Sequence, residues 1–155
     1  IEETDIGLMQ YRFIDWLGFC IDERFAVLRL EQSSTTFNLD YVSNMIGLAL
    51  KKVLDLDPVY NYTFNTPGKF YCTQLVCWLY KQAIGVTLCE PKPVKYFIAN
   101  KLLYGVFKVG NWLSKVFTKG AVFVDDSQGL YYVGNETNGG IYASPNLDRV
   151  FEYTP

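Results

Sequence analysis

The sequence has 155 residues, of which 50% are apolar and 17% aromatic, with a formal net charge of -2 at pH 7. This length and composition are typical of one folded domain with a sizeable core and exclude a disordered chain. Because acidic and basic side chains nearly balance, we expect no nucleic-acid partner.

The first predicted elements are strands and then a long helix. A strand-like opening is followed by mixed residues and by "RFAVLRL", whose composition suits a strand. From Leu39 to Val53, apolar residues recur at steps of three or four, which predicts a helix. Asn38 or Thr36 could supply its N-cap.

The stretch "KFYCTQLVCWLY" places Cys72 at the start of the next predicted helix. Pro67 and Gly68 favour a turn before it, the pattern from Thr73 to Ile84 is helical, and Gly85 could end the helix. The N-terminal N–H groups of a helix favour a thiolate. A free cysteine is nevertheless more often a small buried residue.

The other cysteines are Cys20, Cys77 and Cys89, and the sequence contains no histidine. The spacing of the cysteines matches neither a zinc site nor a small disulfide framework, so we expect free thiols, no metal and no other cofactor. Cys77 lies about 140° around the helix from Cys72 and is expected to pack in the core.

Lysines dominate the segment between Glu90 and Asp125, which has no acidic residue. Lys101, Lys108 and Lys115 lie seven apart, so a helix would gather them on one face. We favour a helix packed on the core with one solvated lysine stripe. The alternatives are a basic helix on an anionic membrane and, given the β-favouring "YGVFKV", strands.

The last forty residues read as short strands separated by turns at Asp125-Asp126, Asn135 and Asn138-Gly139-Gly140. No repeat or low-complexity linker interrupts the chain, and no stretch reaches the 18 uninterrupted apolar residues of an ordinary membrane-spanning helix. We therefore predict a single α+β domain over residues 1–155.

The segment "VYNYTFNTPGKFYCTQLVCWLYKQAIGV" resembles the active-site segment of the circularly permuted, papain-like NlpC superfamily. In that family a Tyr-Asp-rich loop leads to a Tyr-Cys-Ser-Glu-Leu-Val helix, which this chain matches with Tyr60-Asn61 and with "YCTQLV". The opening "IEETDIGLMQYRFIDWL" and "FAVLRL" resemble the family's first strands, and "YASPNLDRVFEY" resembles its closing segment.

The resemblance covers residues 1–88 well and 141–154 weakly, and it leaves residues 90–140 as a long insertion. It implies a permuted papain-like fold in which helices pack on a small antiparallel sheet or half-barrel. In the family's chain order, the catalytic histidine precedes the strand that begins this sequence. We therefore expect the histidine on a strand upstream of Ile1, and an upstream fragment of the same gene product is a candidate partner.

The resemblance implies that Cys72 is the nucleophile and that Glu2 orients the histidine, because Glu3 would point to the opposite face of the strand. Tyr60, Asn61 and Tyr71 are candidate substrate contacts. The implied activity is a thiol hydrolase or acyltransferase acting on a peptide, an amide or a lipid ester, with this chain alone inactive. The alternative is an inactive papain-like module that binds lipid, peptide or protein.

Overall fold

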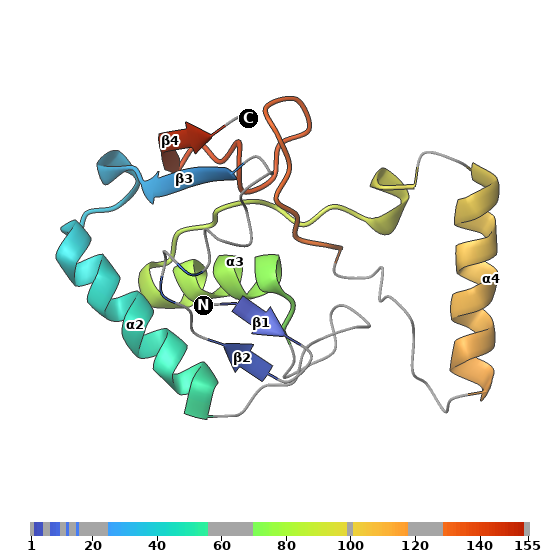
Figure 1. The fold of residues 1–155 in the computed structure, drawn as a ribbon. Helices are drawn as coiled ribbons and strands as arrows, with labels where there is room; N and C mark the ends of the chain where they lie inside the picture. The colour runs from blue at the N-terminus through green and yellow to red at the C-terminus, as the bar shows by residue number, and fades with distance from the viewer. Residues whose placement is uncertain are drawn as a thin grey trace.

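The structure is a computed structural model that describes residues 2–4, 7–9, 12, 15, 25–55, 70–98, 101–117 and 129–153. For residues 2–4, 7–9, 114 and 115 this description covers the backbone alone. Figure 1 shows two helices in contact, a two-stranded sheet above them, a second short sheet near the N-terminus and a separate helix to one side. The chain therefore combines helices with small antiparallel sheets, as an α+β protein does.

Helix α2 (Leu39–Asp55) follows a short 3-10 turn, η1 (Gln32–Ser34). The Oδ1 atom of Asn38 accepts a hydrogen bond from the Tyr41 N–H at 2.8 Å, which caps the first turn. The alternative cap, Thr36, is not used in this way. Val42 and Val53 lie on the buried side of the helix, as the three- and four-residue spacing predicts.

Helix α3 (Cys72–Ile84) begins at the cysteine and ends at the predicted glycine. Gly85 adopts a left-handed conformation with φ of 74°, and its N–H bonds the Lys81 carbonyl at 3.0 Å. A residue without a Cβ adopts this conformation without steric strain. The predicted boundaries of this helix are thus confirmed to within one residue.

In the described part of the chain, two sheets of two antiparallel strands each accompany the helices. Strand β1 (Glu2–Thr4) pairs with β2 (Gly7–Met9), and strand β3 (Phe25–Leu30) pairs with β4 (Leu147–Tyr153). The β3–β4 sheet thereby joins segments from opposite ends of the sequence. The expected strand at "RFAVLRL" and the expected closing strand are both confirmed.

The core consists of two clusters that share α2 and α3. The first joins Leu30 of β3 and Val42 of α2 to Cys77 of α3 and to Leu88, which is 2% exposed. The second joins Val53 of α2 to Leu75 and Leu79 of α3, so these two leucines pack in the core as expected. Burial of these side chains is what holds α2 against α3.

The lysine-rich segment forms a helix, α4 (Lys101–Phe117), and not strands. It follows the short 3-10 turn η2 (Val94–Tyr96) and stands apart from α2 and α3 (Figure 1). The expectation that this helix packs on the core is wrong. Its apolar side chains are exposed, among them Leu102 at 75%, Val106 at 63% and Phe117 at 79%.

The segment from Gly129 to Ser144 has fewer strands than the sequence predicts. A single antiparallel bridge joins Leu130 to Lys92, and another joins Asn135 to Gly139 across a turn. The expected turn at Asn138-Gly139-Gly140 is confirmed, with φ of 82° at Gly139 and 83° at Gly140. The expected turn at Asp125-Asp126 lies outside the described residues.

Candidate functional site

Cys72 is the first residue of α3, and its side chain is exposed. The preceding residue, Tyr71, has an extended backbone, and its carbonyl accepts the first hydrogen bond of the helix from the Leu75 N–H at 2.9 Å. By helix geometry, the N–H of Cys72 has no partner within the helix. The thiol and a backbone donor therefore lie together at the positive end of the helix dipole.

The residues on either side of Cys72 anchor the start of α3 to a distant segment. The Tyr71 hydroxyl accepts a hydrogen bond from the Tyr131 N–H at 2.7 Å, and the Thr73 hydroxyl donates one to the Tyr131 carbonyl at 3.1 Å. Both polar groups of the Tyr131 peptide backbone are thus bound by the residues that flank the thiol. This double contact fixes where Cys72 lies relative to the 130–133 segment.

The Tyr71 side chain is buried, with 3% of its surface exposed. Burial raises the pKa of its phenol well above the ordinary value, and the hydrogen bond from Tyr131 opposes this only in part. Tyr71 therefore remains a neutral hydroxyl across the physiological range. The observed contacts give it a structural role, while its role as a substrate contact stays a prediction.

Cys77 lies about one and a half turns further along α3, and its thiol pairs with that of Cys89, which lies beyond the end of the helix. The Sγ atoms of Cys77 and Cys89 are 3.5 Å apart, with Cys77 buried and Cys89 half-buried. The hydrogen bond from Cys77 lowers the pKa of Cys89 to about 7, and burial acts in the opposite direction. The same hydrogen bond, together with burial, raises the pKa of Cys77.

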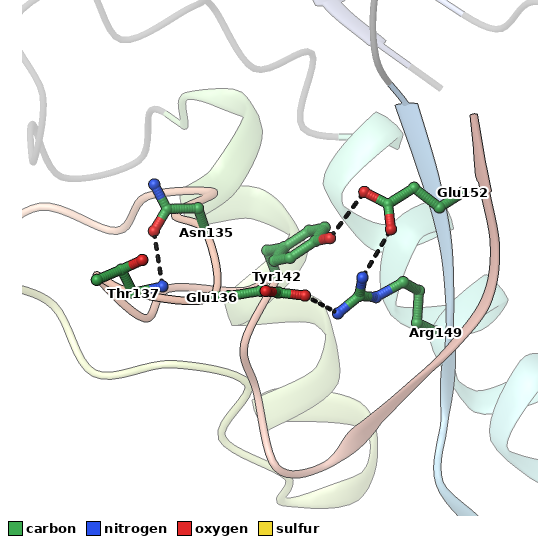
Figure 2. A network of polar contacts seen from close by, with 6 residues as sticks. All are labelled: Asn135, Glu136, Thr137, Tyr142, Arg149 and Glu152. Atoms are coloured by element: carbon green, nitrogen blue, oxygen red, sulfur yellow. Dashed lines mark hydrogen bonds and ion pairs between the residues drawn. The ribbon is translucent and has the colours of Figure 1, made fainter. Parts of the chain in front are cut away.

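A cleft of about 650 Å³ lies along the β3–β4 sheet. Arg149 of β4 occupies its wall between two carboxylates, at 2.7 Å from Glu136 and 2.6 Å from Glu152 (Figure 2). The Tyr142 hydroxyl donates to Glu152 at 3.0 Å, and its ring lies against the guanidinium. These charges are exposed, so their pairing shapes the cleft more than it stabilises the fold.

An irregularity in the β3–β4 register explains this network. Val27 pairs with Phe151, whereas the next residue, Leu28, pairs with Arg149, so Val150 is an extra residue on β4. In a regular strand, residues 149 and 152 would point to opposite faces. The bulge brings Arg149 and Glu152 to the same face, where they form their ion pair.

The predicted site residues are only partly brought together by the described structure. Cys72, Tyr71 and Thr73 share one end of α3. Tyr60 and Asn61 lie outside the described residues, as does the side chain of Glu2, whose backbone pairs with Met9 in the β1–β2 sheet. Among the described residues, Cys72 is not part of the lining of the β3–β4 cleft.

Two features of this region were missed by sequence reasoning. Tyr131 lies 58 residues beyond Thr73, and no motif marks it as a partner of α3. Cys89 was expected to lack a chemical environment, yet it faces Cys77 because the chain reverses direction after Gly85. Within the described part of the chain, no three histidine, cysteine, aspartate or glutamate residues are grouped so that they could hold a metal ion.

In comparisons with family models, curated proteins and solved structures, no match to this chain was found. The function is therefore argued from the residues and from the geometry around them.

Proposed function

We propose that the chain belongs to a papain-like thiol hydrolase or acyltransferase in which Cys72 carries the acyl group. The observation that carries this proposal is that Cys72 is an exposed thiol on the first residue of a 13-residue helix. Thiol nucleophiles of papain-like enzymes depend on the same features, because access and the helix dipole both favour attack by the thiolate. The permuted NlpC-type fold is part of this proposal.

The chemistry is acyl transfer from an amide or an ester. The Cys72 sulfur forms a bond to the substrate carbonyl carbon, and the carbonyl oxygen takes the negative charge. The Cys72 N–H at the helix start is placed to donate to that oxyanion. The C–N or C–O bond then breaks, the leaving group takes a proton, and a thioester remains on Cys72 until water releases the acid or another acceptor takes over the acyl group.

Proton transfer in this scheme needs a general base and acid, and the sequence has no histidine to supply it. The resemblance to the NlpC superfamily assigns that role to a histidine encoded ahead of Ile1, with Glu2 orienting its ring. Proton transfer by such a group contributes roughly 10²- to 10⁴-fold to the rate. We therefore expect the 155-residue chain to accept an acyl group at Cys72 and to release it slowly.

The decisive experiment is acylation with an activated, alkyne-tagged fatty acyl ester, followed by mapping of the modified cysteine by mass spectrometry. We expect a thioester on Cys72 in the wild-type chain and its loss in Cys72→Ser. Cys89→Ser is the matched control, because it removes another accessible thiol without touching the start of α3. A Cys89→Ser chain should be acylated at Cys72 as the wild type is.

Turnover is then compared between this chain and a longer product of the same gene that includes the residues before Ile1. We expect release of the acyl group to be at least about 10²-fold faster in the longer product. The proposal is overturned if Cys72 takes up no acyl group in either protein, or if Cys72→Ser leaves the turnover of the longer product unchanged. A peptide amide and a lipid ester as substrates then distinguish the two substrate classes.

A further inference from the structure

Helix α4 exposes a continuous apolar face to solvent. At about 100° per residue, Leu102, Val106, Val109 and Leu113 fall within about 60° of one another, and Figure 1 shows the helix standing away from α2 and α3. Exposure is 75% for Leu102, 63% for Val106 and 57% for Val109. A surface helix of a globular protein normally turns such a face toward the core, so this one has a different role.

Basic side chains border the apolar face, and α4 contains no acidic residue. Lys101 and Lys108 lie about 20° apart around the helix, at one edge of the face. Trp112 falls between these lysines and the apolar residues and is itself exposed. Tryptophan is enriched where an apolar phase meets water, because its ring is apolar and its N–H is polar.

We infer that α4 is a membrane-surface helix that docks this protein on an anionic bilayer. Its apolar face enters the boundary between headgroups and acyl chains, while Lys101 and Lys108 contact lipid phosphates and carboxylates. This arrangement of exposed apolar residues, a bordering tryptophan and lysines is what an interfacial helix requires. In the described part of the chain, no helix is both long and apolar enough to span a membrane.

The charge of α4 favours an anionic bilayer, and not a second copy of the chain, as the partner that covers its apolar face. Pairing two α4 faces would bring the lysines of both copies together with no acidic residue on either helix to neutralise them. Anionic lipids supply that neutralisation. The inference does not depend on catalysis, so Cys72→Ser should bind membranes as the wild type does.

The test is sedimentation of the 155-residue chain with vesicles of phosphatidylcholine alone or with about 30% phosphatidylserine. We expect binding to the mixed vesicles to be at least about tenfold stronger than to the neutral ones. Double charge reversal, Lys101→Glu with Lys108→Glu, should remove that difference. Val106→Asp with Val109→Asp should weaken binding to both kinds of vesicle.

Helix α2 offers matched controls for both changes. Lys51→Glu with Lys52→Glu reverses two exposed lysines, and Leu48→Asp alters an apolar side chain that is 57% exposed, like Val109. Both controls should bind the mixed vesicles as the wild type does, and circular dichroism checks that every variant is folded.

Three outcomes overturn the inference. The first is that the wild type binds neither kind of vesicle or binds both equally, and the second is that the α4 variants bind as the α2 controls do. The third is that light scattering detects a dimer in solution that Val106→Asp dissociates, because a second copy would then cover the face.

Discussion

Individual side chains decide how Cys72 is presented. Tyr71 and Thr73 have opposite hydrogen-bonding roles, one accepting from and one donating to the backbone of Tyr131. Removing the Tyr71 hydroxyl would leave the Tyr131 N–H without that acceptor in a part-buried position. A buried donor without a partner destabilises the folded state by its full desolvation penalty, because it bonds neither to water nor to protein.

We predict that Tyr71→Phe lowers the free energy of unfolding by about 1–3 kcal/mol, measured by urea denaturation. The control is Tyr41→Phe, because the Tyr41 side chain is exposed on α2. It should change the free energy of unfolding by less than about 0.5 kcal/mol. Equal stability of Tyr71→Phe and wild type would mean that the hydrogen bond to Tyr131 is not a structural anchor.

The two thiols of α3 differ from one another because their surroundings differ. Cys72 is exposed at the helix end, whereas Cys77 is buried and shares a hydrogen bond with Cys89. A thiolate on Cys89 gains from this donor, which is why its pKa is lowered to about 7 from 9.0. Alkylating reagents react with the thiolate and not with the thiol.

The reactivity of Cys89 should therefore rise with pH through about 7, because the thiolate fraction increases as the pH passes the pKa. We predict that Cys77→Ala moves this rise to higher pH, since the donor is lost. The measurement is the rate of iodoacetamide alkylation at Cys89, followed by peptide mass spectrometry from pH 5.5 to 9.5. Cys72→Ser should leave the profile unchanged. A profile that is the same in Cys77→Ala would rule out the hydrogen-bonded pair.

At the scale of elements, the start of α2 and the end of α3 lie where local chemistry dictates. Asn38 caps α2 through its own side chain, and Gly85 ends α3 through its backbone conformation. A Cβ added at Gly85 would meet no atom within 4 Å. Any cost of a substitution there therefore comes from the backbone conformation and not from a clash.

We predict that Gly85→Ala lowers the free energy of unfolding by about 1 kcal/mol, because alanine disfavours a left-handed backbone. Gly47→Ala is the matched variant with the opposite expected effect on stability, since Gly47 lies within α2 and a Cβ added there would also meet no atom within 4 Å. It should raise the free energy of unfolding by about 0.5–1 kcal/mol. Urea denaturation of both variants measures the two effects, and the same sign in both would contradict the explanation.

For the molecule as a whole, the buried core and the exposed apolar helix are different regions. The two buried clusters join α2, α3, β3 and the chain around Leu88 into one body. The β3–β4 pairing ties residues 25–30 to residues 147–153, so the ends of the described core are held together. Helix α4 keeps its apolar side chains on the outside, and we therefore expect surface binding and not core packing to be its contribution.

The local elements could be predicted because their signals lie within a few residues. The strand-favouring composition of "RFAVLRL", the spacing of apolar residues in α2, and Gly85 after α3 each act through neighbouring atoms. The position of Cys72 at a helix start follows from the same local signals. The exposure of the Cys72 side chain does not follow from local signals, because segments distant in the sequence decide whether a helix start is covered.

What the sequence by itself determined is helices α2 and α3, strand β3 and the place of Cys72 at the start of α3, since capping, turn formation and periodicity are local interactions. The tertiary structure alone decided that Tyr131 meets Tyr71 and Thr73, that Cys89 meets Cys77, and that α4 turns its apolar face outward. Those contacts depend on how the whole chain closes, and an amphipathic helix has the same sequence pattern whether a core or a bilayer covers it.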